Sequence, residues 1–85
     1  MIKIKMSDIE KVFLNTFSNT TIDKSIIDLK LGDLDEWDSL GNFNLLLAIE
    51  KFYNIRFSME QMAEIKSIKS LIKNIYHIGS YQIFY

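Results

Sequence analysis

The sequence has no proline and only three glycines in 85 residues, and this constrains its fold more than any single motif does. Proline interrupts a helix because it lacks an amide hydrogen and clashes with the preceding turn, and glycine weakens a helix through its backbone freedom. A chain nearly free of both favours helices joined by short polar loops. We therefore expect an all-α fold within one domain that spans residues 1–85.

The first expected helix covers about residues 7–17. Ser7 and Glu10 have the spacing of a capping box, and Met6 is placed to form its hydrophobic staple. The apolar residues that follow recur at helical spacing: Ile9, Val12, Phe13 and Phe17. Residues 1–5 alternate apolar and basic side chains, and the sequence leaves open whether they form a short strand or an extra turn.

Residues 18–38 are expected to form a long loop between the first and second helices. Asn19, Thr20 and Thr21 end the first helix, because short polar side chains compete for backbone hydrogen bonds. A solvated linker would not carry the six aliphatic residues of this stretch: Ile22, Ile26, Ile27, Leu29, Leu31 and Leu34. The loop, which has room for one helical turn, should lay these side chains over the core.

Three more helices are predicted by their caps. Asp38 is a suitable N-cap for a helix over 40–53 that Asn54 ends. Ser58 and Gln61 repeat the capping-box spacing and open a short third helix through about residue 63. The fourth helix begins after a Ser67 cap and keeps an apolar stripe at i, i+3, i+4 and i+7 in Ile68, Leu71, Ile72 and Ile75.

Eight residues are expected to converge in the core: Phe13, Phe17, Leu45, Ile49, Tyr53, Ile68, Leu71 and Ile75. Trp37 is expected to be partly exposed beside Ser39. Residues 1–6 and 79–85 are expected at the periphery of the domain, and the aromatic segment 81–85 is left unassigned.

Charge and composition exclude several functions. A formal charge of −1 disfavours nucleic-acid binding, which needs a basic surface. The absence of cysteine leaves no disulfide and no thiolate ligand or nucleophile. No apolar run approaches the roughly 20 residues of a membrane span. The first residues do not have the pattern of a secretory signal, so a cytoplasmic location is expected. The chain is also expected to be a monomer.

Two kinds of active centre fit the sequence poorly. A serine hydrolase needs a base near its nucleophile and a strained turn that presents the serine. That turn normally has glycine two residues before the serine, where this chain has Trp37. The only histidine, His77, lies far along the chain from Ser39. A calcium loop counted from Asp33 needs glycine at its sixth position and glutamate at its twelfth, where Asp38 and Asn44 stand. We expect neither an enzyme nor a metal site.

Asp38, Ser39 and Leu40 stand at the start of the longest expected helix. Free N–H groups and the positive end of the helix dipole favour an anion there, and a serine at this position faces out of the core. For the tripeptide alone, simple helix capping by Asp38 and Ser39 is the preferred interpretation.

The tripeptide belongs to a longer pattern. It is followed by an aliphatic helix with a glutamate near its end, an aromatic residue, a short extended stretch, a brief acidic helix, a serine cap and a final apolar helix. The corresponding segments are Asp38-Ser39-Leu40, Leu45 to Ile49, Glu50, Tyr53, Ile55 to Phe57, Met59 to Glu64, Ser67, and Ile68 to Ile75. Over about half of the chain, from Leu34 to Ile75 without a gap, the sequence resembles the acyl carrier protein family.

The resemblance implies a right-handed four-helix bundle of the acyl-carrier type, with 4′-phosphopantetheine esterified to Ser39. Asp38 and Leu40 flank this attachment site, and Asp38 would also help the transferase hold its magnesium. The terminal thiol of the arm would carry an acyl or aminoacyl thioester. The implied partners are a phosphopantetheinyl transferase and acyl- or aminoacyl-loading and transfer enzymes, and the carrier itself catalyses nothing.

The sequence departs from carriers of bulk fatty acid synthesis. Glu36 and Trp37 replace a Leu-Gly pair, Gly41 and Asn44 stand where acidic residues are usual, and Lys51 replaces another acid. These differences resemble a specialised carrier for a polyketide, nonribosomal peptide, surface-glycan or lipid-modification pathway.

Enzymes dock on the second helix in the family, so the residues expected to contact partners are Phe43, Asn44, Leu47, Glu50 and Lys51. Leu40, Phe43 and Leu47 share one stripe, which must point outward if Leu45 and Ile49 face the core. The other hypothesis is a non-catalytic helical interaction module without the prosthetic group.

Overall fold

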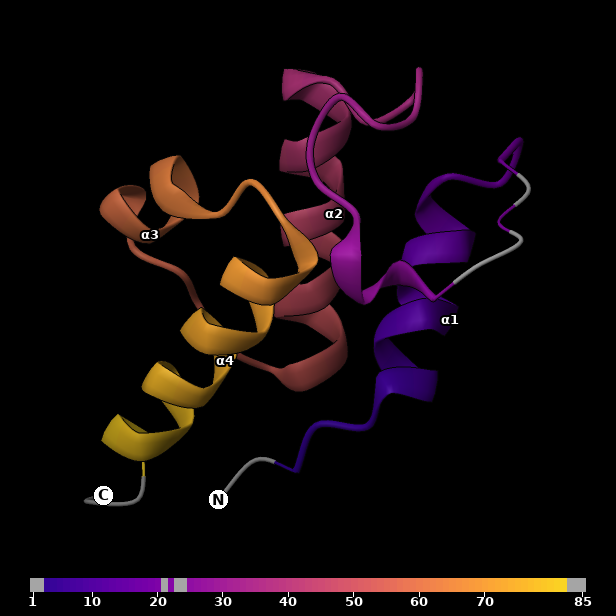
Figure 1. Ribbon diagram of the computed structural model, residues 1–85. Coiled ribbons are helices and arrows are strands. Elements are labelled where there is room, and N and C mark those ends of the chain that lie inside the picture. Colours follow the sequence, from indigo (N-terminus) through magenta and orange to yellow (C-terminus); the bar gives the residue numbers. More distant parts are fainter. Residues whose placement is uncertain (1–2, 21, 23–24, 83–85) are drawn as a thin grey trace.

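The protein is described by a computed structural model that covers residues 3–20, 22 and 25–82 (Figure 1). These residues form four α-helices and one 3-10 turn, and no strand: α1 Met6–Thr16, η1 Ile26–Asp28, α2 Ser39–Tyr53, α3 Met59–Glu64 and α4 Ile68–Gln82. The all-α prediction and the number of helices are confirmed for this part of the chain.

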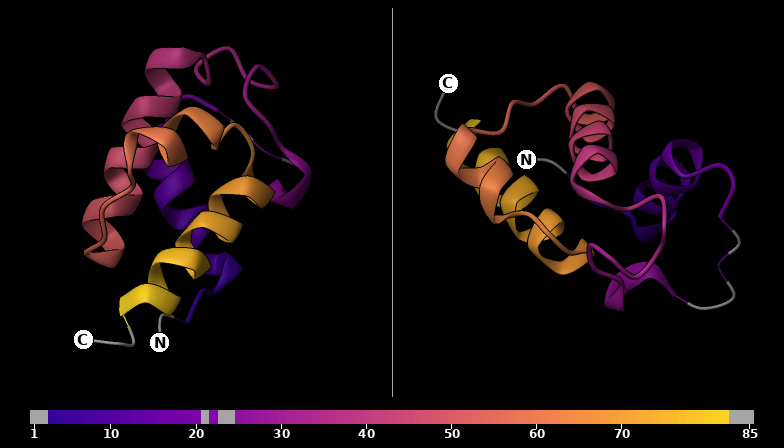
Figure 2. Two further views of the ribbon diagram at one scale, coloured as in Figure 1. Left: turned by 90° about the vertical axis from the view of Figure 1, so that its left-hand side faces the viewer. Right: turned by 90° about the horizontal axis from the view of Figure 1, so that it is seen from above.

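Helix α2 lies between α1 on one side and α3 with α4 on the other (Figures 1 and 2). α1 and α2 pack against each other and run in opposite directions. The long loop between them contains η1, which packs against α4. The loop also pairs with the entry to α4, because the Leu31 N–H donates to the Lys66 carbonyl at 2.8 Å and the Ile68 N–H donates to the Leu29 carbonyl at 3.1 Å.

The core is one continuous apolar cluster, formed by Ile9, Val12, Phe13, Phe17, Ile26, Leu29, Trp37, Leu45, Leu46, Ile49, Ile55, Phe57, Ile65, Ile68, Leu71 and Ile75. Seven of the eight predicted core residues belong to it, and Tyr53 packs at its edge. The loop prediction is confirmed as well: Ile26 and Leu29 are buried, and the other four aliphatic side chains of the loop pack against the cluster.

The start of α1 differs from the prediction. Its N-cap is Lys5, which supplies no side-chain hydrogen bond, so Ser7 and Glu10 do not form a capping box. The physical reason is the packing of Ile4 against the core. This contact moves the N-cap two residues earlier, from the predicted Ser7 to Lys5, and puts Ile4 and Ile9, rather than Met6, at the two positions of a hydrophobic staple.

The other predicted caps are present. Asn54 ends α2 in the left-handed conformation with φ 55°. Ser58 and Gln61 form the full capping box of α3. At α4 the Ser67 hydroxyl accepts from the Ser70 N–H at 3.0 Å, and the Ser70 hydroxyl accepts from the Ser67 N–H at 3.0 Å. These caps satisfy helix N–H groups that have no partner within the helix.

The Tyr53 hydroxyl is buried and has no hydrogen-bond partner among the described residues. Burial raises the pKa of this hydroxyl, and the charges of Asp8 and Tyr76 raise it further, because all three disfavour the phenolate. Tyr53 therefore acts as a neutral packing residue.

None of the helices in the described part of the chain is both long and apolar enough to cross a bilayer. The expected strand or extra turn at 1–5 falls partly on residues 1–2, which lie outside the described residues, and residues 3–5 form neither. In the unassigned segment 81–85, α4 extends to Gln82 and residues 83–85 lie outside the described part.

Candidate functional site

Ser39 is the first residue of α2, and its side chain is exposed. Asp38 caps the helix, with its Oδ1 accepting from the Gly41 N–H at 2.8 Å. The Asn42 N–H donates to the Asp38 carbonyl at 2.8 Å. The N–H groups of Ser39 and Leu40 have no partner among the described residues. The hydroxyl thus stands beside two unpaired donors at the positive end of a helix, where an anion is favoured.

Ser39 also lines an open groove between α2 and α3, with a volume of about 360 Å³. The groove is lined by Leu31, Ser39, Asn42, Phe43, Leu46, Met59, Met62, Ala63 and Lys66. Six of these side chains are apolar, none is acidic, and Lys66 is the only charged one. A flexible molecule attached to Ser39 would therefore have an apolar surface immediately beside it.

Trp37 is buried, with only 1% of its surface exposed, so the prediction of a partly exposed side chain is wrong. Its indole makes edge contacts with Phe13 at a centroid distance of 5.3 Å and lies 6.0 Å from Phe17. The indole N–H donates to Asn42 Oδ1 at 3.0 Å, and Asn42 Nδ2 donates to the Ile65 carbonyl at 2.8 Å. The residues before Ser39 are thus fixed to α1, to α2 and to the chain after α3.

Gly41 is required by a close backbone approach. A Cβ atom built on Gly41 would overlap the carbonyl oxygen of Glu36 and come within 3.1 Å of the Phe17 ring. The loop can lie this close to α2 only because Gly41 has no side chain. The absence of an acidic residue at this position therefore has a structural reason, which is the burial of the neighbouring Trp37.

The acidic loop before Ser39 uses its carboxylates within the fold. Asp33 Oδ2 accepts from the Lys30 N–H at 2.8 Å, and Glu36 Oε1 accepts from the Asn19 N–H at 3.2 Å. Together with the Asp38 cap, three of the four acids bind backbone N–H groups. The described residues contain no group of three or more His, Asp or Glu side chains that could hold a metal ion.

The predicted docking stripe on α2 faces outward. Leu40 is 69% exposed, Phe43 48% and Leu47 43%. Asn44 and Lys51 are exposed as well. This orientation confirms the prediction that the stripe opposes Leu45 and Ile49, both of which are buried.

Glu50 is the only acid on α2 after Ser39, and it is half-buried. Its Oε2 accepts from the Phe57 N–H at 2.7 Å, which ties α2 to the extended stretch before α3. This carboxylate therefore has a structural role in addition to any contact with a partner.

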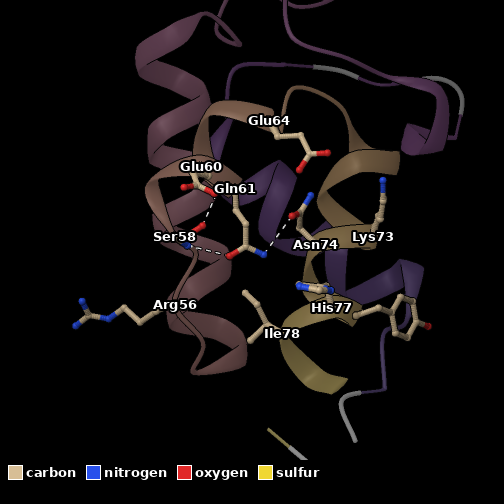
Figure 3. A pocket seen from close by; sticks show the side chains of 10 residues that line it. Arg56, Ser58, Glu60, Gln61, Glu64, Lys73, Asn74, His77 and Ile78 are labelled. Atoms are coloured by element: carbon tan, nitrogen blue, oxygen red, sulfur yellow. Dashed lines mark hydrogen bonds between the residues drawn. The ribbon is translucent and has the colours of Figure 1, made fainter. Parts of the chain in front are cut away.

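A separate hollow of about 830 Å³ lies between α3 and α4 (Figure 3). Gln61 and Asn74 meet across it, with Gln61 Nε2 donating to Asn74 Oδ1 at 3.2 Å. His77 lines this hollow, whereas Ser39 lines the other groove. The chain's one histidine and its best-placed serine therefore do not share a site.

Two residues at the site were not predicted from the sequence, Asn42 and Lys66. Asn42 precedes Leu45 and Ile49 by three and seven residues, so it falls on the buried stripe of α2, and this spacing was the available signal. Lys66 lies in the connection between α3 and α4, and the folded chain brings it to the groove. The sequence has no signal for this position.

Comparison of this chain with protein-family models, with curated proteins and with solved structures finds no match. The sequence pattern and the geometry of the Ser39 region are therefore the observations that bear on function.

Proposed function

We propose that the chain is a carrier of the acyl-carrier type that holds acyl or aminoacyl groups as thioesters on a 4′-phosphopantetheine arm at Ser39. The observation that carries this proposal is the exposed Ser39 hydroxyl at the start of α2, which lies beside an apolar groove. The bundle and the order of its helices are consistent with the same proposal.

The residues around Ser39 fit the chemistry of such an arm. A phosphodiester on Ser39 would lie next to the unpaired N–H groups of Ser39 and Leu40, which favour a negative charge. The pantetheine part would have apolar groove walls within reach. Asp38 caps α2 with one carboxylate oxygen, and its other oxygen would help the transferase hold its magnesium.

When attached, the arm supplies the thiol that this cysteine-free chain lacks. The chain's own residues anchor the arm and present it, and partner enzymes perform the chemistry. The proposed partners are a phosphopantetheinyl transferase and loading and transfer enzymes of a specialised pathway. We further propose that the carrier acts as a cytoplasmic monomer.

A helical interaction module without the arm remains the second candidate, because the exposed Leu40, Phe43 and Leu47 stripe suits protein contacts in either case. The two functions differ by one covalent addition. Intact mass therefore separates them directly.

The test is incubation with coenzyme A, magnesium and several broad-specificity phosphopantetheinyl transferases. We expect the intact mass to increase by one phosphopantetheine, and peptide mapping to place the addition on the peptide that contains Ser39. If none of the transferases adds the group, the carrier function is wrong and the interaction module is favoured.

Recognition of α2 by partners is expected to depend on apolar contacts. Its outward face has an apolar stripe, and its only acid after Ser39 is engaged with Phe57. We expect Phe43→Ala to lower the kcat/KM of modification by about tenfold, which corresponds to about 1.4 kcal/mol. We also expect the modification rate to depend only weakly on salt. Salt mainly weakens charge pairs that speed encounter, and this face of α2 offers few of them.

The matched control is Phe52→Ala, which removes another exposed phenylalanine of α2 that lies outside the stripe. Lys51→Glu tests charge on the same helix and should change the rate only slightly. A steep salt dependence with an unaffected Phe43→Ala variant would contradict this prediction and assign docking to the acidic loop at 33–38.

A further inference from the structure

Lys66 is the only charged residue that lines the groove beside Ser39. Its backbone is held on both sides: the Lys66 N–H donates to the Ser70 hydroxyl at 3.1 Å, and its carbonyl accepts from the Leu31 N–H at 2.8 Å. Leu31 is itself a wall of the groove. The base of the Lys66 side chain therefore has a fixed position at this groove, while its flexible stem leaves the ammonium group free to adjust.

The ammonium group of Lys66 has no ion pair within the described part of the chain. Its neighbour along the chain, Lys69, does form an ion pair, with Asp28 at 3.1 Å. Lys66 is exposed and lies in the turn between α3 and α4. A cation in this position is available to a group that enters the groove.

A countercharge would stabilise a phosphodiester on Ser39 in addition to the two N–H groups at the start of α2. Its negative charge would stand next to the Asp38 carboxylate, and two like charges at this distance repel each other. The groove contributes no further acid, and its one cation is Lys66. An ion pair between Lys66 and the phosphodiester would offset the repulsion and turn the arm toward the side where α3 lies.

We infer that Lys66 is a positioning residue that pairs with the phosphodiester of the arm and holds the arm against the Met59 and Met62 side of the groove. This inference rests on the proposed function of Ser39. Because this chain has little acidic charge on α2, the arm would be held by an ion pair near its root and by apolar contacts beyond it. The two methionines present soft, adaptable surfaces for such contacts.

The methionines allow a direct test. The chain has four methionines, of which Met59 and Met62 line the groove. Met6 begins α1, at the end of the bundle opposite the start of α2 (Figure 1). The methionine methyl groups are labelled with carbon-13, and NMR spectra are recorded before and after modification of Ser39. A change in a methyl signal then reports contact between that methionine and the arm.

We expect attachment of the arm to shift the methyl signals of Met59 and Met62 and to leave that of Met6 in place. Lys66→Ala should remove most of this shift, and high salt should reduce it, because salt screens exposed ion pairs. Lys66→Arg should keep the shift, since it keeps the charge. The matched control is Lys73→Ala, an exposed lysine of α4 that lines the other hollow, and it should behave as the wild type.

The outcomes distinguish this inference from the proposed function. Absence of the phosphopantetheine mass overturns both. A modified wild type whose Met59 and Met62 signals do not move, or a Lys66→Ala variant that shows the full shift, overturns the role of Lys66 and leaves the carrier function standing.

Discussion

Replacing Ser39 by Ala is expected to abolish the addition of phosphopantetheine completely and to leave the fold intact. The reaction needs the serine oxygen as its nucleophile, and no other side chain at the start of α2 carries a hydroxyl. The fold should tolerate the change, because the Ser39 side chain is exposed and makes no hydrogen bond to a described residue. Alanine is also the best helix former.

The measurement is the intact mass after incubation with transferase, magnesium and coenzyme A, together with the helical circular dichroism of the variant. Asp38 continues to cap α2, so the free energy of unfolding should change by no more than about 0.5 kcal/mol. Ser58→Ala is the matched control: it removes another serine at the start of a helix and should leave the modification complete. A Ser39→Ala protein that still gains the mass, or a Ser58→Ala protein that does not, contradicts Ser39 as the attachment site.

The helices of this protein could be predicted because their ends are encoded locally. Asp38, Ser58 and Ser67 each cap a helix with a side-chain oxygen, and these caps act over three residues. The start of α1 was misplaced because a tertiary contact decided it. Ile4 packs on a core that is formed by residues far along the chain, and a local capping rule does not include such a contact.

Trp37 shows more clearly that local sequence rules do not predict contacts between distant parts of the chain. It lies in a loop, where no helical period indicates which side chains face inward. Its burial depends on Phe13 and Phe17 from α1 and on a hydrogen bond to Asn42 on α2. Composition alone places tryptophan in either environment, because its large ring is apolar and its N–H needs a partner.

Two of the differences from the acyl-carrier pattern that the sequence resembles, Trp37 and Gly41, are explained together by this packing. The buried Trp37 brings the Glu36 carbonyl against α2, and only Gly41 allows that approach. Asn42 then satisfies the indole N–H. From the sequence, Gly41 was interpreted only as a position that lacks the usual acid, and Asn42 was assigned no role. In the structure they have packing and hydrogen-bonding roles, which a reading of surface charge does not reveal.

The position of Ser39 was predictable, whereas the groove beside it was not. An N-terminal helix residue after an aspartate cap faces outward by local geometry. The groove instead combines Leu31 from the loop, α2, α3 and Lys66, and these segments meet only in the folded chain. The outward stripe of Leu40, Phe43 and Leu47 was predictable only in part. The helical period gives its orientation, but only after the buried side of the helix has been assigned.

Replacing Trp37 by Ala is expected to lower the free energy of unfolding by about 3–5 kcal/mol, as truncations of large buried aromatic residues do. Trp37 is among the largest fully buried side chains, and its removal leaves a cavity against Phe13 and Phe17. It also deprives Asn42 Oδ1 of its donor inside the core. Small domains have a stability of roughly 5–15 kcal/mol, so this loss is severe.

Two variants separate the causes of this loss. Trp37→Phe keeps much of the ring packing but removes the N–H, so its cost should be smaller and dominated by the unsatisfied Asn42 oxygen, at about 1–3 kcal/mol. Phe52→Ala removes an aromatic side chain that is half exposed, and it should cost less than either change at Trp37. Urea denaturation followed by circular dichroism gives all three values, since that signal does not depend on tryptophan. If Trp37→Ala unfolds at the urea midpoint of the wild type, then Trp37 does not anchor the loop before Ser39, and the geometry around Ser39 has another origin.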